Sequence, residues 1–299
     1  MPNARVIGTG MFLPEKILTN RDLEALCDTT DEWIRKRTGI EHRHMANPED
    51  GTSDLSVPAA QMAMADAGID PLEVDCIVHC TVTPDSALPA TGSIVQGRLG
   101  CTNASAFDLN AACSGFIYGL TTANAYIRSG LYKTVLVIGS EIQTNRLTWK
   151  NRDTSVLFAD GAGAVVLRAE DTDTDGILFT YAGSDGASYE ILHVPLGGSR
   201  HPISAENVNN DPWTITMDGR ELFRRAVTKF PECAQIAFDA TGLTKEDIKL
   251  FIGHQANARI LEAAAQRMGL REDQVFINIH HVGNTTAGSI PIALHEAKE

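Results

Sequence analysis

Cys113 stands at a place in the sequence where a thiol could act as a nucleophile. It lies in the segment FDLNAACSGF (residues 107–116), where a predicted buried strand ends and an apolar helix begins. The unpaired backbone N–H groups and the positive dipole at the start of a helix favour a thiolate. Small neighbouring residues would let a substrate reach the sulfur. The segment therefore favours covalent catalysis by Cys113, although a small, packed cysteine is the alternative that applies to any single cysteine.

Two further polar residues could stabilise negative charge. His254 ends a second predicted strand, in FIGHQANAR (251–259), and Asn284 lies in a turn, in HVGNTTAGSIP (281–291). An imidazole N–H and a side-chain amide both donate hydrogen bonds, which a developing oxyanion requires. Each residue also has a structural alternative, because a lone histidine is usually a packing residue and a turn asparagine is usually a cap.

Apolar segments and helical patterns alternate along the whole chain, which predicts an α/β fold. The segment 135–138 is apolar on both faces, as expected for a strand that helices cover on each side. The glycines of the segment 160–163 lie within a long strand pattern and predict a bulge or tight hairpin there. The predicted strands are 5–8, 75–82, 105–109, 133–139, 155–167, 248–253 and 274–279, and the predicted helices are 54–67, 114–129, 219–240 and 257–268.

A faint internal repeat predicts two related halves. The segment ADAGI (65–69) followed by VDCIV (74–78) resembles DATGL (239–243) followed by IKLFI (248–252) at one constant spacing. In each copy a helix ends at a glycine and a short loop leads to a buried strand. The next strand leads through a turn rich in small residues into a helix, at 110–119 and at 283–292. We predict halves at residues 1–170 and 171–299, divided at the polar stretch 170–175, with the two turns meeting near the middle.

Composition excludes several functional classes. The chain of 299 residues has 43% hydrophobic residues, enough for a real core, and a net charge of −13. A field of that sign repels phosphate backbones and anionic lipids, so we expect neither nucleic-acid nor membrane-surface binding. The N-terminus lacks the apolar stretch of a signal peptide, and a cytoplasmic location is the resulting expectation. The cysteines and histidines lack metal-ligand spacing, so we predict no metal site.

Together the three polar segments resemble the β-ketoacyl-acyl-carrier-protein synthase III family of the thiolase-fold superfamily, whose members start bacterial fatty-acid chains. The resemblance extends nearly end to end, through IGTG (7–10) with LPE (13–15), TDEWI (30–34) with RTGI (37–40), and FADGAGA (158–164). It implies a thiolase-like α/β fold, with two duplicated halves packed as a layered α-β-α-β-α structure. The family's Cys-His-Asn triad falls on Cys113, His254 and Asn284. Asparagine in third place separates the chain from the Cys-His-His elongating synthases and from thiolases, which use a second cysteine.

The resemblance implies a decarboxylating Claisen condensation that needs no cofactor. Cys113 would take the acyl group from an acyl-CoA primer as a thioester. Malonyl-acyl-carrier protein would then lose carbon dioxide, and the side chains of His254 and Asn284 would donate to the resulting thioester oxyanion. Attack of the carbanion on acyl-Cys113 would give the 3-oxoacyl-carrier protein. Because a neutral asparagine cannot accept a proton, hydrogen-bond stabilisation fits this pair better than two-base chemistry.

The resemblance also implies binding residues. Trp33 and Arg152 match residues that sandwich the adenine of CoA, and Arg37 matches a residue near its phosphates. Arg224 and Arg259 match basic positions that receive the acidic carrier protein. On a chain of net negative charge, docking of an acidic partner requires such a local basic patch.

Two positions are implied in the pocket for the primer. Leu88, before Pro89, matches the residue that reaches across the interface of a homodimer into the partner's pocket, and Phe158 belongs to the same pocket. The family often places a bulky aromatic residue at the position of Leu88. The smaller leucine predicts tolerance for primers longer than acetyl.

The second half departs from the family's pattern. The chain ends in the helix after Asn284, whereas the family continues into a closing pair of strands, so we expect the last strands to be missing. Two alternatives to the condensing enzyme stay open. A Cys-dependent acyltransferase of a secondary-metabolite pathway would release no carbon dioxide from malonyl-carrier protein. A non-catalytic partner subunit would normally lack the nucleophile.

Overall fold

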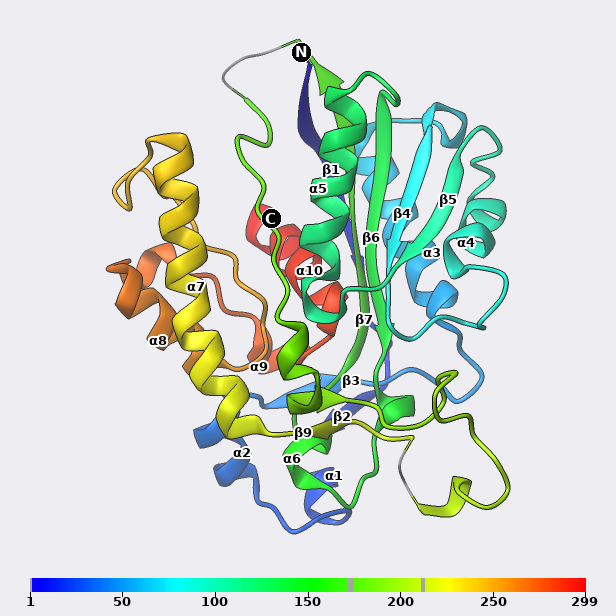
Figure 1. Cartoon of the computed structure of the whole chain (residues 1–299), viewed down its shortest axis with the longest axis vertical. Helices are drawn as coiled ribbons and strands as arrows, with labels where there is room; N and C mark the ends of the chain where they lie inside the picture. The colour runs from blue at the N-terminus through cyan, green and yellow to red at the C-terminus, as the bar shows by residue number, and fades with distance from the viewer. Residues whose placement is uncertain (1, 172–174, 211–212) are drawn as a thin grey trace.

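A mixed five-stranded sheet organises the first half of the chain in the computed structural model, which describes residues 2–171, 175–210 and 213–299 (Figure 1). The strand order is β1-β7-β6-β4-β5. β4 is parallel to both β5 and β6, and β7 is antiparallel to both β6 and β1. The strands are β1 (Asn3–Phe12), β4 (Cys76–Cys80), β5 (Ser105–Leu109), β6 (Thr134–Ile142) and β7 (Asp160–Glu170).

Helices cover both faces of this sheet (Figure 1). The side chains of β6 alternate between two cores, with Leu136 and Ile138 in one and Val135 and Val137 in the other. A strand that is apolar on both faces fits a sheet with two covered faces. The predicted α/β fold is therefore confirmed. On the first face lie α3 (Thr52–Ala67) and α4 (Thr91–Leu99), and on the second α5 (Gly115–Arg128) and α10 (Ser289–Lys298).

The turns before α5 and α10, which the internal repeat predicts to meet, lie in contact. The first is the 3₁₀ turn η2 (Ala112–Ser114) and the second is η7 (Thr286–Gly288). A Cβ atom on Gly115 would lie 3.4 Å from the Cβ of Ala287. The predicted seam at 170–175 includes residues 172–174, which lie outside the described residues, and the boundary between the halves stays a prediction.

The second half contains α7 (Gly219–Thr241), α8 (Ala258–Met268) and the short α9 (Ile279–Val282). α7 and α8 pack on one another at one side of the molecule (Figure 1). The predicted strands 248–253 and 274–279 are wrong as regular strands. Only the bridge between Phe251 and Val275 pairs them, because the two segments run side by side over too few residues for a continuous ladder.

The predicted strand 155–167 is wrong at its start, because α6 (Arg152–Ser155) comes first and β7 begins at Asp160. The predicted bulge or hairpin at 160–163 is also wrong. Gly161 and Gly163 pair in regular register with β6. A Cβ atom on Gly163 would lie 2.6 Å from the backbone nitrogen of Ile292, so the glycine is required by the close approach of α10 rather than by a turn.

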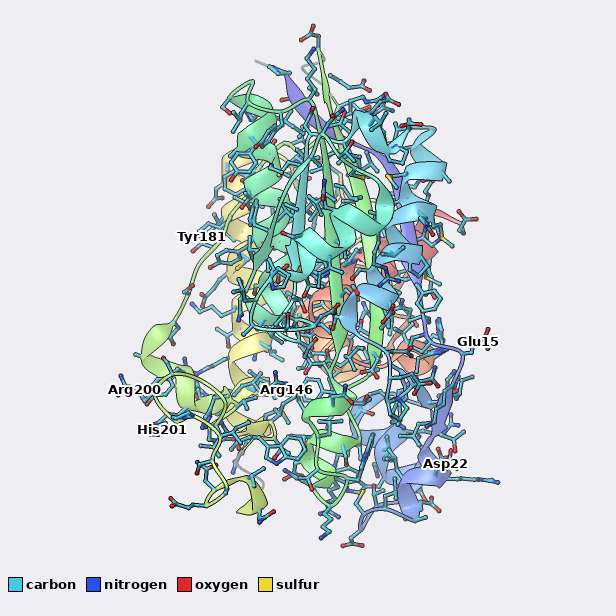
Figure 2. All side chains as sticks on the ribbon, turned by 90° about the vertical axis from the view of Figure 1, so that its right-hand side faces the viewer. Glu15, Asp22, Arg146, Tyr181, Arg200 and His201 are labelled. Atoms are coloured by element: carbon cyan, nitrogen blue, oxygen red, sulfur yellow. The ribbon has the colours of Figure 1, made fainter. Side chains whose placement is uncertain are left out.

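Smaller elements surround one end of the sheet (Figure 1). Figure 2 shows Tyr181, Arg200 and His201 on the segment between β7 and α7, at the side of the molecule opposite Glu15 and Asp22. No helix in the described ranges combines the length and the apolar character that crossing a membrane requires. The small elements are β2 (Ile17–Thr19), α1 (Asn20–Glu24), α2 (Asp31–Thr38), β3 (His42–His44), β8 (Leu192–His193) and β9 (Thr216–Met217).

Candidate active site

A cavity of about 950 Å³ brings together the three polar residues that the sequence singles out. Cys113 comes from the turn before α5, His254 from the loop before α8, and Asn284 from the loop before η7. Mostly apolar walls with a few convergent polar groups are typical of sites for small molecules and cofactors. The apolar lining includes Leu192, Met217, Leu222, Phe223, Phe230 and Ile260.

The turn that carries Cys113 has an unusual backbone. β5 ends at Leu109, and Ala112 adopts a left-handed conformation with φ of 47°. Side chains other than glycine rarely adopt this region, and such residues cluster at functional sites. The turn places Cys113 half-buried on the cavity wall, directly before α5.

Cys113 is a thiol at neutral pH. Burial and, secondarily, the negative charge of Glu141 raise the pKa of Cys113 to about 12, and a backbone hydrogen bond offsets only part of this shift. The direction of this shift is opposite to the stabilisation of a thiolate that the helix N-terminus is expected to give. Desolvation of the charged sulfur outweighs the nearby backbone N–H groups. Any reaction in which this sulfur acts as a nucleophile must therefore include the loss of the thiol proton.

His254 is a neutral imidazole at neutral pH. Burial lowers the pKa of His254 to about 4. Both ring nitrogens are buried, and neither has a hydrogen-bond partner in the described part of the chain. Because unpaired buried polar atoms are costly, a bound group that supplies the partner would explain them. A neutral imidazole has one N–H to donate to such a group.

Gln255 fixes the backbone beside His254. Its own N–H donates to the Ser289 hydroxyl oxygen at 2.7 Å. Its side-chain amide nitrogen donates to the carbonyl oxygens of Gly253 at 3.0 Å and Phe276 at 3.1 Å. No sequence pattern pointed to Gln255, whose only signal is its place next to His254.

Asn284 is held by its backbone and by its side-chain oxygen. Its N–H donates to the Leu157 carbonyl at 3.0 Å, and its carbonyl accepts from the Ala159 N–H at 2.9 Å. The Thr286 N–H donates to Asn284 Oδ1 at 3.0 Å. With the oxygen occupied, the amide nitrogen is the group that is left to donate into the cavity. The two backbone hydrogen bonds to Leu157 and Ala159 form a β-bridge between Asn284 and Phe158, and Phe158 also lines the cavity.

The arrangement thus combines one thiol with two uncharged hydrogen-bond donors. Such donors stabilise a negative oxygen without bringing a formal charge into an apolar cavity. The thiol supplies a nucleophile that a thioester can acylate. The cavity can therefore support acyl transfer and a reaction that passes through an enolate.

The cavity also includes the three residues expected to bind CoA. The guanidinium carbon of Arg152 lies 4.9 Å from the centre of the Trp33 ring, and that of Arg37 lies 5.9 Å from it. Arg152 also donates to the Asp28 carbonyl oxygen at 2.9 Å. Because Arg152 lies directly on Trp33, a base can stack between them only after the Arg152 side chain moves.

The two arginines expected to receive a carrier protein lie near the same cavity. Arg259 lines it and stacks on the Phe223 ring, 5.6 Å from the ring centre. Arg224 forms an ion pair with Glu221 at 2.6 Å and lines a neighbouring pocket of about 430 Å³. Two further arginines, Arg220 and Arg267, line that pocket and were not predicted from the sequence. The spacing of Arg220 and Arg224, one helical turn apart, is the signal that could have indicated the first.

Leu88 lies outside the cavity of its own chain. It belongs to the loop between β4 and α4, and its side chain is 86% exposed. The described residues contain no group of three or more His, Cys, Asp or Glu side chains that could hold a metal ion.

Comparison with known proteins links the fold and the site to one family. The family model described as "3-Oxoacyl-[acyl-carrier-protein (ACP)] synthase III" matches residues 107–186, and the model of its C-terminal part matches residues 238–299. The first match contains Cys113, and the second contains His254 and Asn284. All three polar residues therefore fall within segments that the family models describe.

Full-length relatives agree with this result. A β-ketoacyl-[acyl-carrier-protein] synthase III of Caldanaerobacter subterraneus is 49% identical over 294 residues, which cover 98% of this chain and 88% of the relative. The crystal structure of a 3-oxoacyl-[acyl-carrier-protein] synthase III from Aquifex aeolicus is 42% identical, with a TM-score of 0.91, and covers 99% of this chain and 90% of its own. The crystal structure of the 3-oxoacyl-(acyl carrier protein) synthase III from Pseudomonas aeruginosa is 40% identical, with a TM-score of 0.90. The match covers 99% of this chain and 89% of the Pseudomonas chain. The expected thiolase-like fold is confirmed, and neither the separate acyltransferase nor the non-catalytic subunit is favoured.

Proposed function

The chain belongs to the 3-oxoacyl-[acyl-carrier-protein] synthase III family, whose acyltransferases start fatty-acid synthesis by condensation, and on this premise we propose how its own residues perform the reaction. Cys113 attacks the carbonyl carbon of an acyl-CoA thioester. The new bond joins the acyl carbon to the sulfur of Cys113, and the bond to the CoA sulfur breaks. The proton of the Cys113 thiol leaves with the CoA thiol. Trp33, Arg37 and Arg152 hold CoA at the mouth of the cavity.

The second half of the reaction uses the two neutral donors. Malonyl-acyl-carrier protein enters the same cavity and loses carbon dioxide, which leaves its electron pair as an enolate. His254 and the amide nitrogen of Asn284 donate to the enolate oxygen. The nucleophilic carbon then bonds to the acyl carbon, the bond to Cys113 breaks, and the sulfur takes up a proton from water. The 3-oxoacyl-carrier protein leaves.

The observation that carries this proposal is the convergence of Cys113, His254 and Asn284 on one cavity, with the imidazole neutral and unpaired. The direct test is to incubate the purified chain with malonyl-carrier protein and a panel of acyl-CoA primers, and to measure the 3-oxoacyl product and carbon dioxide. We expect a 3-oxoacyl product and an equal amount of carbon dioxide. Acylation of Cys113 without carbon dioxide would instead indicate an acyltransferase, and the absence of acylation would indicate a non-catalytic subunit.

The proposal includes the setting of the reaction. The substrates are an acyl-CoA and malonyl-acyl-carrier protein, and no metal or other cofactor takes part. The active unit is a homodimer in the cytoplasm, in which each Leu88 reaches the partner's primer pocket. The exposure of Leu88 supports this arrangement, because its side chain is available to a second subunit.

Replacement of Arg259 by glutamate is expected to weaken the use of the carrier protein. Arg259 is a cation at the cavity that an acidic partner must approach, and reversal of a charge at a docking surface opposes association. We expect the KM for malonyl-carrier protein to rise about tenfold, and to rise more than the KM for acyl-CoA. Steady-state kinetics at low and high ionic strength measure the change, which salt should reduce.

Arg271→Glu is the matched control for Arg259→Glu. Arg271 is paired with Asp273 beyond the C-terminal end of α8, whereas Arg259 lies in its first turn. A loss of the same size in both variants would show that net charge, rather than a local docking site, determines the KM.

Leu88 is expected to admit primers longer than acetyl. We expect a medium-chain acyl-CoA to be used at least as well as acetyl-CoA, and Leu88→Phe to shift the ratio of kcat/KM values towards acetyl-CoA by about tenfold, because a larger ring shortens the pocket. Kinetics with acetyl-, butyryl- and octanoyl-CoA measure the ratio. A wild-type chain that strongly prefers acetyl-CoA would contradict this prediction.

A further inference from the structure

The loop of residues 84–90, here called the Leu88 loop, presents its apolar side chain outside the body of the subunit. It connects Thr83, after β4, to Thr91, the first residue of α4. Under the proposed function, Leu88 can select a primer only if this loop holds it in one place relative to the sheet. The position of Leu88 therefore depends on the contacts that fix the two ends of the loop.

A buried carboxyl group holds the segment that enters the loop. Glu141, near the end of β6, is fully buried. Its Oε2 accepts from the Thr83 hydroxyl at 2.5 Å and from the Thr81 hydroxyl at 3.3 Å. The Val82 N–H donates to both oxygens, at 3.1 and 3.2 Å. Three consecutive residues thus attach to one carboxyl group.

Thr83 links this segment back to the sheet. Its hydroxyl oxygen accepts from the Ile142 N–H at 3.0 Å, so that its proton is directed to Glu141. Its own N–H donates to the Thr81 hydroxyl oxygen at 3.1 Å. The hydroxyl of Thr83 therefore joins β6, Glu141 and the beginning of the Leu88 loop.

A second carboxyl group holds the end of the loop. Asp108 accepts from the N–H groups of Thr91 and Gly92, at 2.8 and 2.7 Å. Within the loop, the Asp85 N–H donates to the Thr91 hydroxyl oxygen at 2.9 Å, and the Ser53 N–H donates to Asp85 at 2.9 Å. The exit of the loop is thus fixed to β5. The entrance is held from two sides: the Thr52 hydroxyl and the Ser53 N–H of α3 donate to the Thr83 carbonyl oxygen and to Asp85, and Glu141 fixes residues 81–83 to β6.

The burial of Glu141 costs free energy, because no positive charge among the residues that the structure describes offsets the desolvation of its carboxylate. Its donors are hydroxyl and backbone N–H groups, which carry no charge. Burial raises the pKa of Glu141 to about 8 despite these hydrogen bonds. Buried polar groups of this kind fix a geometry when all their partners are in place.

We propose that Glu141 is a positioning residue for primer recognition, which fixes the entrance of the Leu88 loop through Thr81, Val82 and Thr83. This inference rests on the proposed function, because Leu88 must select the primer for its position to matter. Glu141 acts on the choice of primer through the loop. Its charge also raises the pKa of Cys113, but that effect is the same for every primer and cancels in a ratio of two primers.

Thr83→Val is the sharpest test, because it removes the hydroxyl and keeps the shape of the side chain. Single-turnover acylation of Cys113 by acetyl-CoA and by octanoyl-CoA, read by intact-protein mass, gives a primer ratio. We expect Thr83→Val and Glu141→Gln to change this ratio at least fivefold. Thr83→Ser, which keeps the hydroxyl, should restore the wild-type value. An unchanged ratio in both Thr83→Val and Glu141→Gln would overturn the proposal.

Asp160→Asn is the matched control. Asp160 is as fully buried as Glu141 and accepts from the Thr144 hydroxyl at 2.6 Å and the Ala46 N–H at 2.8 Å, but it holds no residue of the Leu88 loop. We expect this variant to lose stability and to keep the primer ratio. An equal change in the ratio would mean that any buried carboxyl group has the same effect, and the proposal would fail.

A double-mutant cycle tests the route through Leu88. In the background of Leu88→Ala, Thr83→Val should produce less than a twofold further change, because the side chain that the loop positions is gone. Full additivity would overturn the proposal.

Amide hydrogen exchange of residues 82–91 gives a readout that requires no activity. We expect Thr83→Val to raise the rate of exchange in these residues at least fivefold. An unchanged rate would also overturn the proposal. A wild-type chain that acylates Cys113 but forms no 3-oxoacyl product would count against the proposed function alone.

Discussion

Replacement of Cys113 by alanine is expected to abolish the formation of 3-oxoacyl product while the loss of carbon dioxide from malonyl-carrier protein continues. The acyl group has no other nucleophile to join in the cavity, so we expect condensation to fall by at least about 10³-fold. His254 and Asn284 remain in place to stabilise the enolate, and decarboxylation should stay within about tenfold of the wild-type rate. Product analysis by mass spectrometry, together with carbon dioxide release, separates the two steps.

The structure adds a second expectation for the thiol itself. Because burial raises the pKa of Cys113 to about 12, the thiolate fraction is small at neutral pH and rises as the pH increases. Alkylation of Cys113 in the free chain should therefore be slow near pH 7 and accelerate up to the highest pH at which the fold persists.

Cys233→Ala controls for the loss of a cysteine. Cys233 is exposed on α7 and does not line the cavity. This variant should retain both steps at wild-type rates. If Cys113→Ala still produced a 3-oxoacyl product, another group would have to carry the acyl chain, and the assignment of the nucleophile would be wrong.

The location of the three polar residues could be predicted from the sequence because the signals are local. Cys113 and Asn284 each lie between an apolar segment and a helix, in a turn rich in small residues. The repeat relates the two turns, and the turns do lie in contact. A strand such as β6 is equally visible, since its apolar side chains alternate between two cores.

The protonation states could not be predicted in this way. The sequence places Cys113 at a helix N-terminus, which favours a thiolate, but burial depends on which distant segments cover the sulfur. Glu141 is a clear example, because nothing in the segment around it indicates that Thr81 and Thr83, some sixty residues earlier, supply its hydrogen bonds. Such contacts follow from strand order, which local patterns do not determine.

The prediction from the glycines of β7 was wrong for a related reason. Gly161 and Gly163 look like a break in a strand, whereas they lie in regular pairing and make room for α10. A close approach between elements far apart in the chain produces the same residue choice as a turn. Residues 248–253 and 274–279 show the opposite error, because strands were predicted there and regular pairing is absent between these two described segments. The two segments are joined by a single β-bridge.

Replacement of Asn284 by aspartate is expected to stop decarboxylation while Cys113 is still acylated. The aspartate has nearly the same shape and keeps the oxygen that accepts from the Thr286 N–H. It loses the amide donor and adds a negative charge that repels the enolate. Removal of one oxyanion donor typically costs 10²–10³ in rate, so we expect a decrease in carbon dioxide release of at least about 10²-fold. Acyl-CoA alone should label Cys113 within about threefold of the wild-type rate, because that step does not form the enolate.

Asn284→Ala separates the loss of the amide donor from the added negative charge, because it removes the donor and adds no charge. We expect it to decrease decarboxylation less than Asn284→Asp does. Asn103→Asp, in the turn between α4 and β5, makes the same chemical change at a surface site and should have no effect.

In the proposed reaction His254 donates to the same enolate oxygen as Asn284, so the two side chains can be tested together. If both side chains donate to one enolate oxygen, His254→Ala and Asn284→Ala together should cost less than the product of the two separate losses, since the first loss already destabilises the bound enolate. If the loss in the double variant equalled the product of the two single losses, the two side chains would donate to different atoms. The proposed oxyanion site would then have to be divided between two steps of the reaction.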